Sequence, residues 1–436
     1  MGALGIEFSF FLIGTIILLG FVGELIFRRT NVPDVLLLLL LGLLLGPVTG
    51  AINPQNLIAI APLFAPIALM VLLFDGGLRM NIYKVLHGSP RAALLTFLGV
   101  TFSIILTAVV MRVAFGWGTL AGALLGAIVG GTSSAIILPI VQRIKMGEKT
   151  SDLLSLESVM TDVLCIVVTL SLLQTAISGS LGADSIQYTI KEVLGTFAVG
   201  GLFGLIAGVV WLEILKKFKG LKYGYMLTLA ILFVLYAISE IFGGSGAIAA
   251  LIFGLSLGNG VELSNMFKLK ENVEIEDDSL KLFQSEVSFF IRTFFFVYLG
   301  SVVVISNYLL VAVGALLSLL LFGSRYVAAR LSTIANKQLS ADKEILTIMC
   351  SRGLAAAVLA QIVVNTPGAP MEAKFYPDLV FVVIIATVVL TSAGVTVWSR
   401  KRKAEEEKGK EKTEASKKPA SVQAPAKNHA KNGVKA

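Results

Sequence analysis

The chain has 436 residues, of which 56% are hydrophobic and 15% are charged, and its mean hydropathy is +0.86. This composition excludes an ordinary soluble domain, in which about a quarter of the residues are charged, and it favours an integral membrane protein. The net charge of +8 does not indicate nucleic-acid binding, because the surplus Lys and Arg lie in short loops and one tail. Two histidines and two cysteines do not form a metal-binding cluster, and no cofactor is expected.

Apolar runs of about 20 residues, enough to cross about 30 Å of hydrocarbon, recur along the chain. They predict an all-α polytopic membrane protein with about thirteen transmembrane helices. The predicted spans are residues 5–27, 33–50, 56–77, 91–115, 118–142, 152–178, 190–215, 222–241, 244–260, 283–304, 307–330, 343–366 and 377–398.

Basic residues are distributed one-sidedly among the loops. Lys and Arg follow the odd-numbered spans, whereas Lys374 is the clear cation after an even-numbered span. Because cytoplasmic loops are enriched in Lys and Arg, we expect the N-terminus outside and the C-terminus in the cytoplasm, with the protein in the plasma membrane and surrounded by lipid. Residues 1–398 would form the membrane domain. Residues 399–436 are rich in Lys, Ala, Glu and Pro, which predicts a disordered basic cytoplasmic tail.

Asp75 lies at the end of the third span, and Arg79 follows in the loop. A pairing of the two at the helix terminus is favoured over contact with an ion, so Asp75 is a secondary candidate.

The fifth span is interrupted by Gly130, Gly131, Thr132, Ser133 and Ser134. Non-helical backbone at membrane depth survives only where it lines a cavity or is covered by protein. The carbonyls freed by such a break, and the hydroxyls of Thr132 and Ser133, are hard oxygen donors that suit sodium or potassium. The alternative interpretation is a packing face of small residues, with the hydroxyls bonded to the preceding turn.

The sixth span carries two acids near mid-membrane, Glu157 and Asp162. Charged residues inside a membrane are costly and indicate function, which favours a functional interpretation of the neighbouring break. Ser158 and Asp162 are four residues apart and share one helix face, while Glu157 shares the adjacent face with Thr161. One acid can therefore face an aqueous cavity while the other pairs inside the bundle.

The later spans repeat the pattern. The twelfth is interrupted at Ser351-Arg352-Gly353, and paired breaks in inverted repeats are the best sequence pointer to a transporter site. Arg352 could offset the negative ends of the half-helices. Arg325 in the eleventh span requires a buried anion, for which Glu157 is the natural partner; the alternative is snorkelling to the interface.

Two charged residues of the tenth span, Glu286 and Arg292, lie six residues apart. We regard both as possible secondary members of the site, because charges within a span are functional by default.

These motifs, in this order, resemble those of the monovalent cation:proton antiporters, the sodium/proton exchangers, from about residue 8 to residue 398. The resemblance implies thirteen helices in two inverted six-helix repeats with crossed discontinuous helices, and a homodimer. It also implies a moving core bundle and a dimerisation part. The core would comprise approximately residues 91–178 and 307–398, and the dimerisation part residues 1–90 and 190–304.

In that family the sixth helix carries an essential aspartate, which matches Asp162. The preceding residue is Asp in electrogenic members and is Thr161 here, which removes a second titratable group. Glu157 and Ser158 match the acid and the serine of the electroneutral archaeal exchangers, in which a core arginine holds the acid. The family's break often reads Thr-Asp-Pro, whereas this chain has Thr132-Ser133-Ser134. One expected acid is therefore missing, which could favour potassium.

The sequence thus predicts a secondary active transporter that exchanges sodium, or else potassium, for protons by alternating access, and not an enzyme. Asp162 would bind either a proton or the cation, helped by Ser158, Thr132 and Ser133, with one proton moved per cation. The main alternative is a sodium-coupled solute symporter on the same scaffold. A channel would need a repeated pore loop, and an intramembrane enzyme would need facing carboxylates or a serine–histidine pair.

Overall fold

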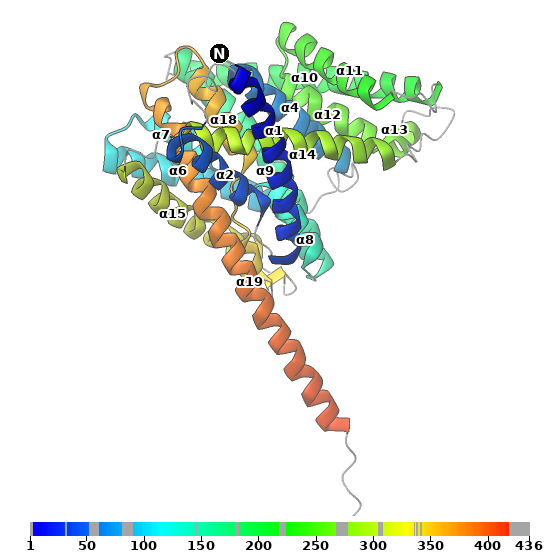
Figure 1. The fold of residues 1–436 in the computed structure, drawn as a ribbon, viewed down its shortest axis with the longest axis vertical. Coiled ribbons are helices and arrows are strands. Elements are labelled where there is room, and N and C mark those ends of the chain that lie inside the picture. The colour runs from blue at the N-terminus through cyan, green and yellow to red at the C-terminus, as the bar shows by residue number, and fades with distance from the viewer. Residues whose placement is uncertain are drawn as a thin grey trace, which may run out of the picture. The chain divides into compact units, whose positions relative to one another are not determined.

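A computed structural model describes residues 3–30, 33–51, 61–80, 90–144, 146–178, 183–217, 224–266, 278–303, 308–334, 336, 339–340 and 342–417. Within these ranges the regular structure is helical throughout (Figure 1). The chain divides into two compact units, Met1–Val395 and Thr396–Ala436. The candidate site lies in the first unit.

Each of the thirteen predicted spans coincides with one helix or with a run of shorter helices. Eight helices in the described part of the chain are long and apolar enough to cross a membrane by themselves. The expected all-α polytopic fold is therefore confirmed. The elements are α1 Ala3–Thr30, α2 Asp34–Leu43, η1 Leu44–Val48, α4 Ala61–Arg79, α6 Pro90–Phe115, α7 Thr119–Ile128, α8 Ser134–Arg143, α9 Glu148–Ser178, α10 Ala183–Lys217, α11 Gly224–Ile241, α12 Gly246–Gly258, α13 Gly260–Met266, α14 Asp278–Val302, α15 Tyr308–Ser332, α17 Lys343–Ile348, α18 Leu354–Asn365, η2 Met371–Phe375 and α19 Tyr376–Lys417.

The fifth and twelfth spans are both broken at the predicted places. Residues 129–133 separate α7 from α8, and residues 349–353 separate α17 from α18. The breaks meet, because the backbone N–H of Ser133 donates to the carbonyl of Ser351 at 2.8 Å. Gly353 lies directly against the side chain of Ser133, so a larger residue there would have no space. Each break thus helps to satisfy backbone groups that the other has lost from its helix.

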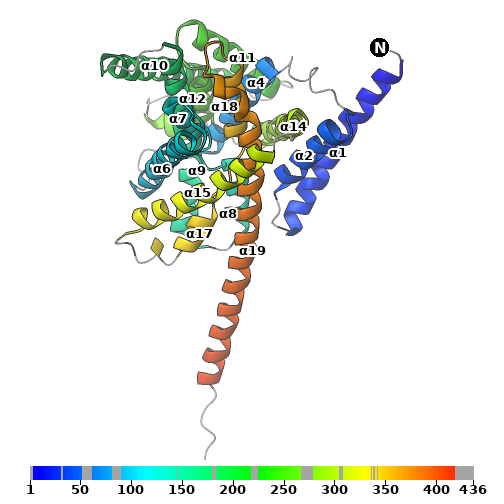
Figure 2. The same cartoon turned by 90° about the vertical axis from the view of Figure 1, so that its left-hand side faces the viewer.

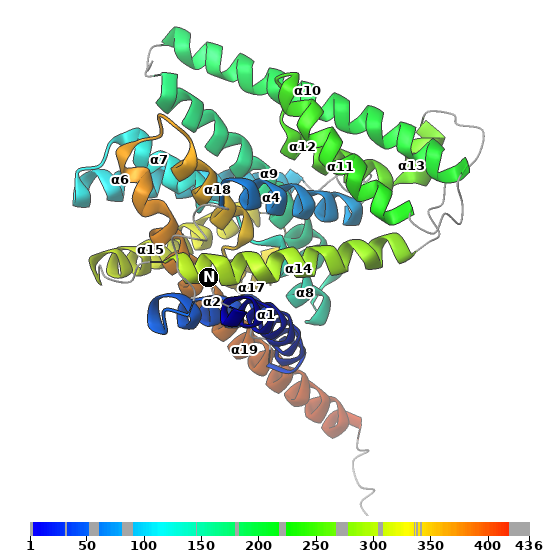
Figure 3. The same cartoon turned by 45° about the horizontal axis from the view of Figure 1, so that its top comes forward.

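Two groups of helices flank the crossing. On one side, α6, α7, α9 and α15 pack together (Figure 2). On the other, α14 lies between α2 and α4 (Figure 3). A side chain at Gly42 of α2 would meet the carbonyl of Val297 on α14, and such small residues let membrane helices approach closely. The helices α2, α4 and α14 therefore form one wall that faces the broken helices.

The C-terminal unit departs from the predicted disorder over part of its length. The structure continues α19 as a helix to Lys417, whereas the sequence predicts a disordered tail from residue 399. Residues 404–417 are rich in Ala, Glu and Lys, which are strong helix formers and can sustain a helix without burying an apolar face. Residues 418–436 lie outside the described residues.

Candidate functional site

The long helix α9 passes behind the break between α7 and α8. Gly131 lies against Cys165 and the backbone of Thr161, so the break rests directly on α9. The two acids of α9 take different surroundings at this point. Glu157 is fully buried, whereas Asp162 is half-buried.

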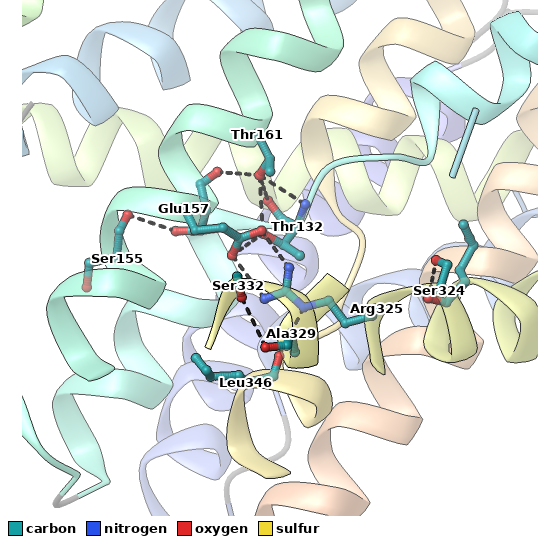
Figure 4. A network of polar contacts seen from close by, with 11 residues as sticks. Thr132, Ser155, Glu157, Thr161, Ser324, Arg325, Ala329, Ser332 and Leu346 are labelled. Carbon is teal, nitrogen blue, oxygen red and sulfur yellow. Dashed lines mark hydrogen bonds and ion pairs between the residues drawn. The ribbon is translucent and has the colours of Figure 1, made fainter. Parts of the chain in front are cut away.

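Glu157 forms a two-pronged ion pair with Arg325 of α15 (Figure 4). The distances are 2.6 Å from Nη1 to Oε1 and 3.1 Å from Nη2 to Oε2. The Nε of Arg325 donates to the carbonyl of Leu346 at 3.0 Å. Charges removed from solvent need such complete pairing to be tolerated. This is the pairing that the sequence predicts, and the alternative of snorkelling does not apply, because Arg325 is 2% exposed.

Thr132 ties the break to this ion pair and not to Asp162. Its hydroxyl donates to Glu157, with Oε1 at 3.1 Å and Oε2 at 3.2 Å. Its backbone N–H donates to the hydroxyl oxygen of Thr161 at 3.2 Å. The hydroxyl of Thr161 in turn donates to the carbonyl of Ser158 at 2.9 Å. Thr132, Glu157, Thr161 and Arg325 therefore form one buried polar network.

Asp162 faces a cavity of about 560 Å³. Its Oδ2 accepts a hydrogen bond of 2.6 Å from the hydroxyl of Ser134, the first residue of α8. Ser133 and Ser134 both line the same cavity, as do Leu354 and Ala355 at the start of α18. A carboxylate, two hydroxyls and the ends of two half-helices thus meet at one cavity, which is large enough for several water molecules.

Charged residues line the opposite wall of the cavity, which α1, α4 and α14 provide. Arg79 pairs with Asp75, with Nε and Oδ1 3.1 Å apart, and Arg292 pairs with Asp34 of α2 at 3.2 Å. Asp75, Arg79 and Arg292 all line the cavity. Glu286 is exposed on α14 and is not among the lining residues. The structure therefore brings Asp75 and Arg292 to the space that Asp162 faces, but not Glu286.

A polar contact joins α14 to α18 outside the cavity lining. The hydroxyl of Tyr298 donates to the side-chain oxygen of Gln361 at 3.3 Å, and both residues are buried. The rings of Phe64 and Phe295 lie against Tyr298, with centroids 6.4 and 5.9 Å away. Tyr298 lies six residues beyond Arg292, about 9 Å along the helix. This contact holds α14 against α18 through residues that do not themselves line the cavity.

Two residues predicted to act at the site have other surroundings. Ser158 is fully buried and its hydroxyl donates to the carbonyl of Ser155 at 3.2 Å. Arg352 is 2% exposed, and its Nε and Nη1 have no hydrogen-bond partner among the described residues. Ser134 was not among the site residues predicted from the sequence. Its position directly after the break was the available signal, since a first helical residue can present its hydroxyl to the neighbouring helix.

Known proteins resemble this chain over most of its length. A family model described as "Sodium/hydrogen exchanger, transmembrane" matches residues 13–400. The chain is 27% identical over 406 residues to the K(+)/H(+) antiporter NhaP of Alkalimonas amylolytica, covering 91% of this chain and 67% of that protein. It is 27% identical over 407 residues to Na(+)/H(+) antiporter 1 of Methanocaldococcus jannaschii, covering 86% and 89%. The solved structure of the sodium proton antiporter MjNhaP1 from that organism at pH 8 matches with a TM-score of 0.74 at 22% identity, covering 89% of this chain and 99% of that chain.

Proposed function

The chain belongs to the sodium/hydrogen exchanger family, and we propose that its exchange of a monovalent cation for protons takes place at one carboxylate, Asp162. The observation that carries this proposal is the position of Asp162 on the cavity, with a hydroxyl as its hydrogen-bond partner. In the described part of the chain, no basic side chain pairs with it. An acid without a fixed counter-charge can accept either a proton or a cation from solution.

Competition for this carboxylate would enforce the exchange. A charged side chain is costly to move through a membrane, whereas a neutralised one is much less so. Either a proton or a sodium or potassium ion neutralises Asp162, so both loaded states can cross. The empty state remains charged and crosses slowly. Because the proton and the cation compete for one site, the proton flux and the cation flux are coupled without any further coupling mechanism.

The buried network supports a stoichiometry of one proton per cation. Glu157 is occupied by Arg325 and Thr132, so it is not free to load an ion. Thr161 stands where a second titratable acid would otherwise lie beside Asp162. A single available carboxylate exchanges one positive charge for another, so the cycle moves no net charge.

The position of the cavity supports alternating access. Its walls come from α8, α9 and α18 on one side and from α1, α4 and α14 on the other. These are the proposed moving core and the proposed dimerisation part of a homodimer. Arg79 lies at the end of α4 that we assign to the cytoplasm, so the cavity would open inward in this state. Separation of Tyr298 from Gln361 would then open the outer side.

The sodium-coupled solute symporter that the sequence left as an alternative is not supported by the relatives, which are named as cation/proton antiporters. Their names include both Na(+)/H(+) and K(+)/H(+) antiporters. We propose sodium as the first cation to test and potassium as the second.

The proposal is tested in proteoliposomes that carry an internal pH dye and an acidic lumen. Addition of sodium, lithium or potassium outside should raise the internal pH with the wild-type protein. Asp162→Asn should abolish the response to every cation while the protein keeps its elution profile and thermal unfolding midpoint. Asp152→Asn, on the same helix and outside the cavity lining, is the matched control and should retain exchange. Wild-type rates in Asp162→Asn would overturn the proposal.

A further inference from the structure

Ser134 is the residue in closest polar contact with the proposed transport carboxylate. Its hydroxyl donates to Oδ2 of Asp162 at 2.6 Å, which is within the range of strong hydrogen bonds between a hydroxyl and a charged oxygen. Both side chains are half-buried and line the cavity. An ion that arrives at Asp162 from the cavity therefore meets the Ser134 oxygen at the same time.

Three other hydroxyls near the crossing already have partners, and that of Ser351, which has none among the described residues, does not line the cavity. Thr132 donates to Glu157, Thr161 donates to the carbonyl of Ser158, and Ser158 donates to the carbonyl of Ser155. The side chain of Ser133 lines the cavity but is held against Gly353. The hydrogen bond from Ser134 to Asp162 is thus the one that an arriving cation would replace with a contact to the Ser134 oxygen.

A hydroxyl can serve each state of a carboxylate, because it has one donor hydrogen and two acceptor lone pairs. It donates to the empty, charged Asp162, as it does in this structure. It can accept from Asp162 once that acid is protonated. It can also turn its hydrogen away and present a lone pair to a cation held by the carboxylate. The backbone N–H groups at the start of α8 can serve the first of these states alone, since they only donate.

We propose that Ser134 is a further ligand of the transported cation and contributes to the choice among monovalent cations. The proposal rests on the proposed role of Asp162. A smaller cation draws its ligands closer together and gains more from an oxygen already beside the carboxylate. Loss of this oxygen should therefore affect lithium and sodium more than potassium.

The test compares the apparent KM for sodium, lithium and potassium in Ser134→Ala and in the wild type, with the dye assay at fixed pH. We expect the KM for sodium to rise about tenfold, as for loss of a hydrogen bond to a charged group, with a smaller rise for potassium. Ser171→Ala is the matched control, because Ser171 is a half-buried serine of α9 whose hydroxyl bonds the carbonyl of Val167, also at 2.6 Å. It should keep the wild-type KM for all three cations.

A second pair of variants separates ligation from packing. Ser134→Thr retains the hydroxyl, whereas Ser134→Val introduces a side chain of nearly the same shape as threonine but without the hydroxyl. The comparison of these two variants remains informative even if Ser134→Ala does not fold. We expect a KM close to wild type in Ser134→Thr and a raised KM in Ser134→Val. An unchanged KM and cation order in the variants without a hydroxyl would overturn the role of Ser134, as would equal effects in Ser134→Thr and Ser134→Val. No exchange by the wild-type protein would instead overturn the proposed function itself.

Discussion

Two carboxylates on one helix, five residues apart, have opposite surroundings. Glu157 is fully buried and satisfied by a two-pronged arginine and a threonine. Asp162 reaches a cavity and is held by one serine hydroxyl. The carboxylate of Glu157 is thus fixed by its partners, whereas that of Asp162 is available to bind an ion from the cavity. The difference lies in what the neighbouring helices supply, because α15 brings a permanent cation to Glu157 while α8 brings a hydroxyl to Asp162.

This contrast separates stability from transport. A buried acid with a permanent counter-charge has no need of a mobile ion, and it fixes α9, α15 and the break relative to one another. An acid on the cavity remains costly until something neutralises it. Substitutions on the Glu157 side should therefore change folding, and substitutions on the Asp162 side should change ion exchange.

The largest expected effect on stability is that of Arg325→Ala. Removal of the guanidinium leaves Glu157 buried without its counter-charge, and breaking such a pair costs about 3–5 kcal/mol. The thermal unfolding midpoint in detergent should fall strongly. Arg330→Ala is the control on the same helix, because Arg330 is exposed and lies over the ring of Tyr326. A midpoint in Arg325→Ala equal to that of the control would contradict the proposed role of the ion pair.

A smaller net effect is expected when both partners are replaced. The double variant Glu157→Gln with Arg325→Met removes both buried charges, and neutral replacements of a buried pair are often tolerated. It should recover at least half of the stability lost in Arg325→Ala. It should also retain measurable cation:proton exchange in proteoliposomes, because Asp162 is unchanged. Complete loss of exchange in a folded double variant would show that Glu157 takes part in ion binding.

The features that the sequence predicts correctly are those set by length and by charge cost. The spans follow from the distance across a bilayer, and the breaks follow from runs such as Gly130 and Gly131 in an apolar segment. The pairing of Glu157 with Arg325 follows from the need to neutralise a buried charge. Each of these constraints acts on the chain without reference to detailed packing.

The partners of individual hydroxyls are not predictable in this way. Ser158 shares a helix face with Asp162 but bonds its own helix, and Thr132 turns toward Glu157. Ser134, which was not chosen, is the residue that contacts Asp162. The direction of these side chains depends on the backbone of the break and on how the two breaks cross. Periodicity describes regular helices and contains no information on that geometry.

A modest effect is expected at the contact between Tyr298 of α14 and Gln361 of α18. Tyr298→Phe removes the hydroxyl that donates to Gln361 and keeps the ring packing, at a cost of about 0.5–1.5 kcal/mol for one hydrogen bond. If the contact closes the outer side, the closed state should become less populated, so Phe64→Cys should react faster with an impermeant thiol reagent when Tyr298→Phe is added to it. Tyr326→Phe on exposed α15 surface is the control. An unchanged labelling rate would argue against a gating role for this contact.

The smallest expected effect is that of membrane potential on the exchange rate. We expect the rate not to depend on the potential at all. With Glu157 held by Arg325 and Thr161 beside Asp162, one carboxylate exchanges one proton for one cation. A potassium gradient with valinomycin sets the potential of proteoliposomes while sodium drives the exchange, and the rate should be the same at positive, zero and negative potential. A rate that rises with one polarity would mean that a second charge moves in each cycle. The guanidinium of Arg352 would then be the first group to examine, since it lies at the crossing and its Nε and Nη1 have no hydrogen-bond partner in the described part of the chain.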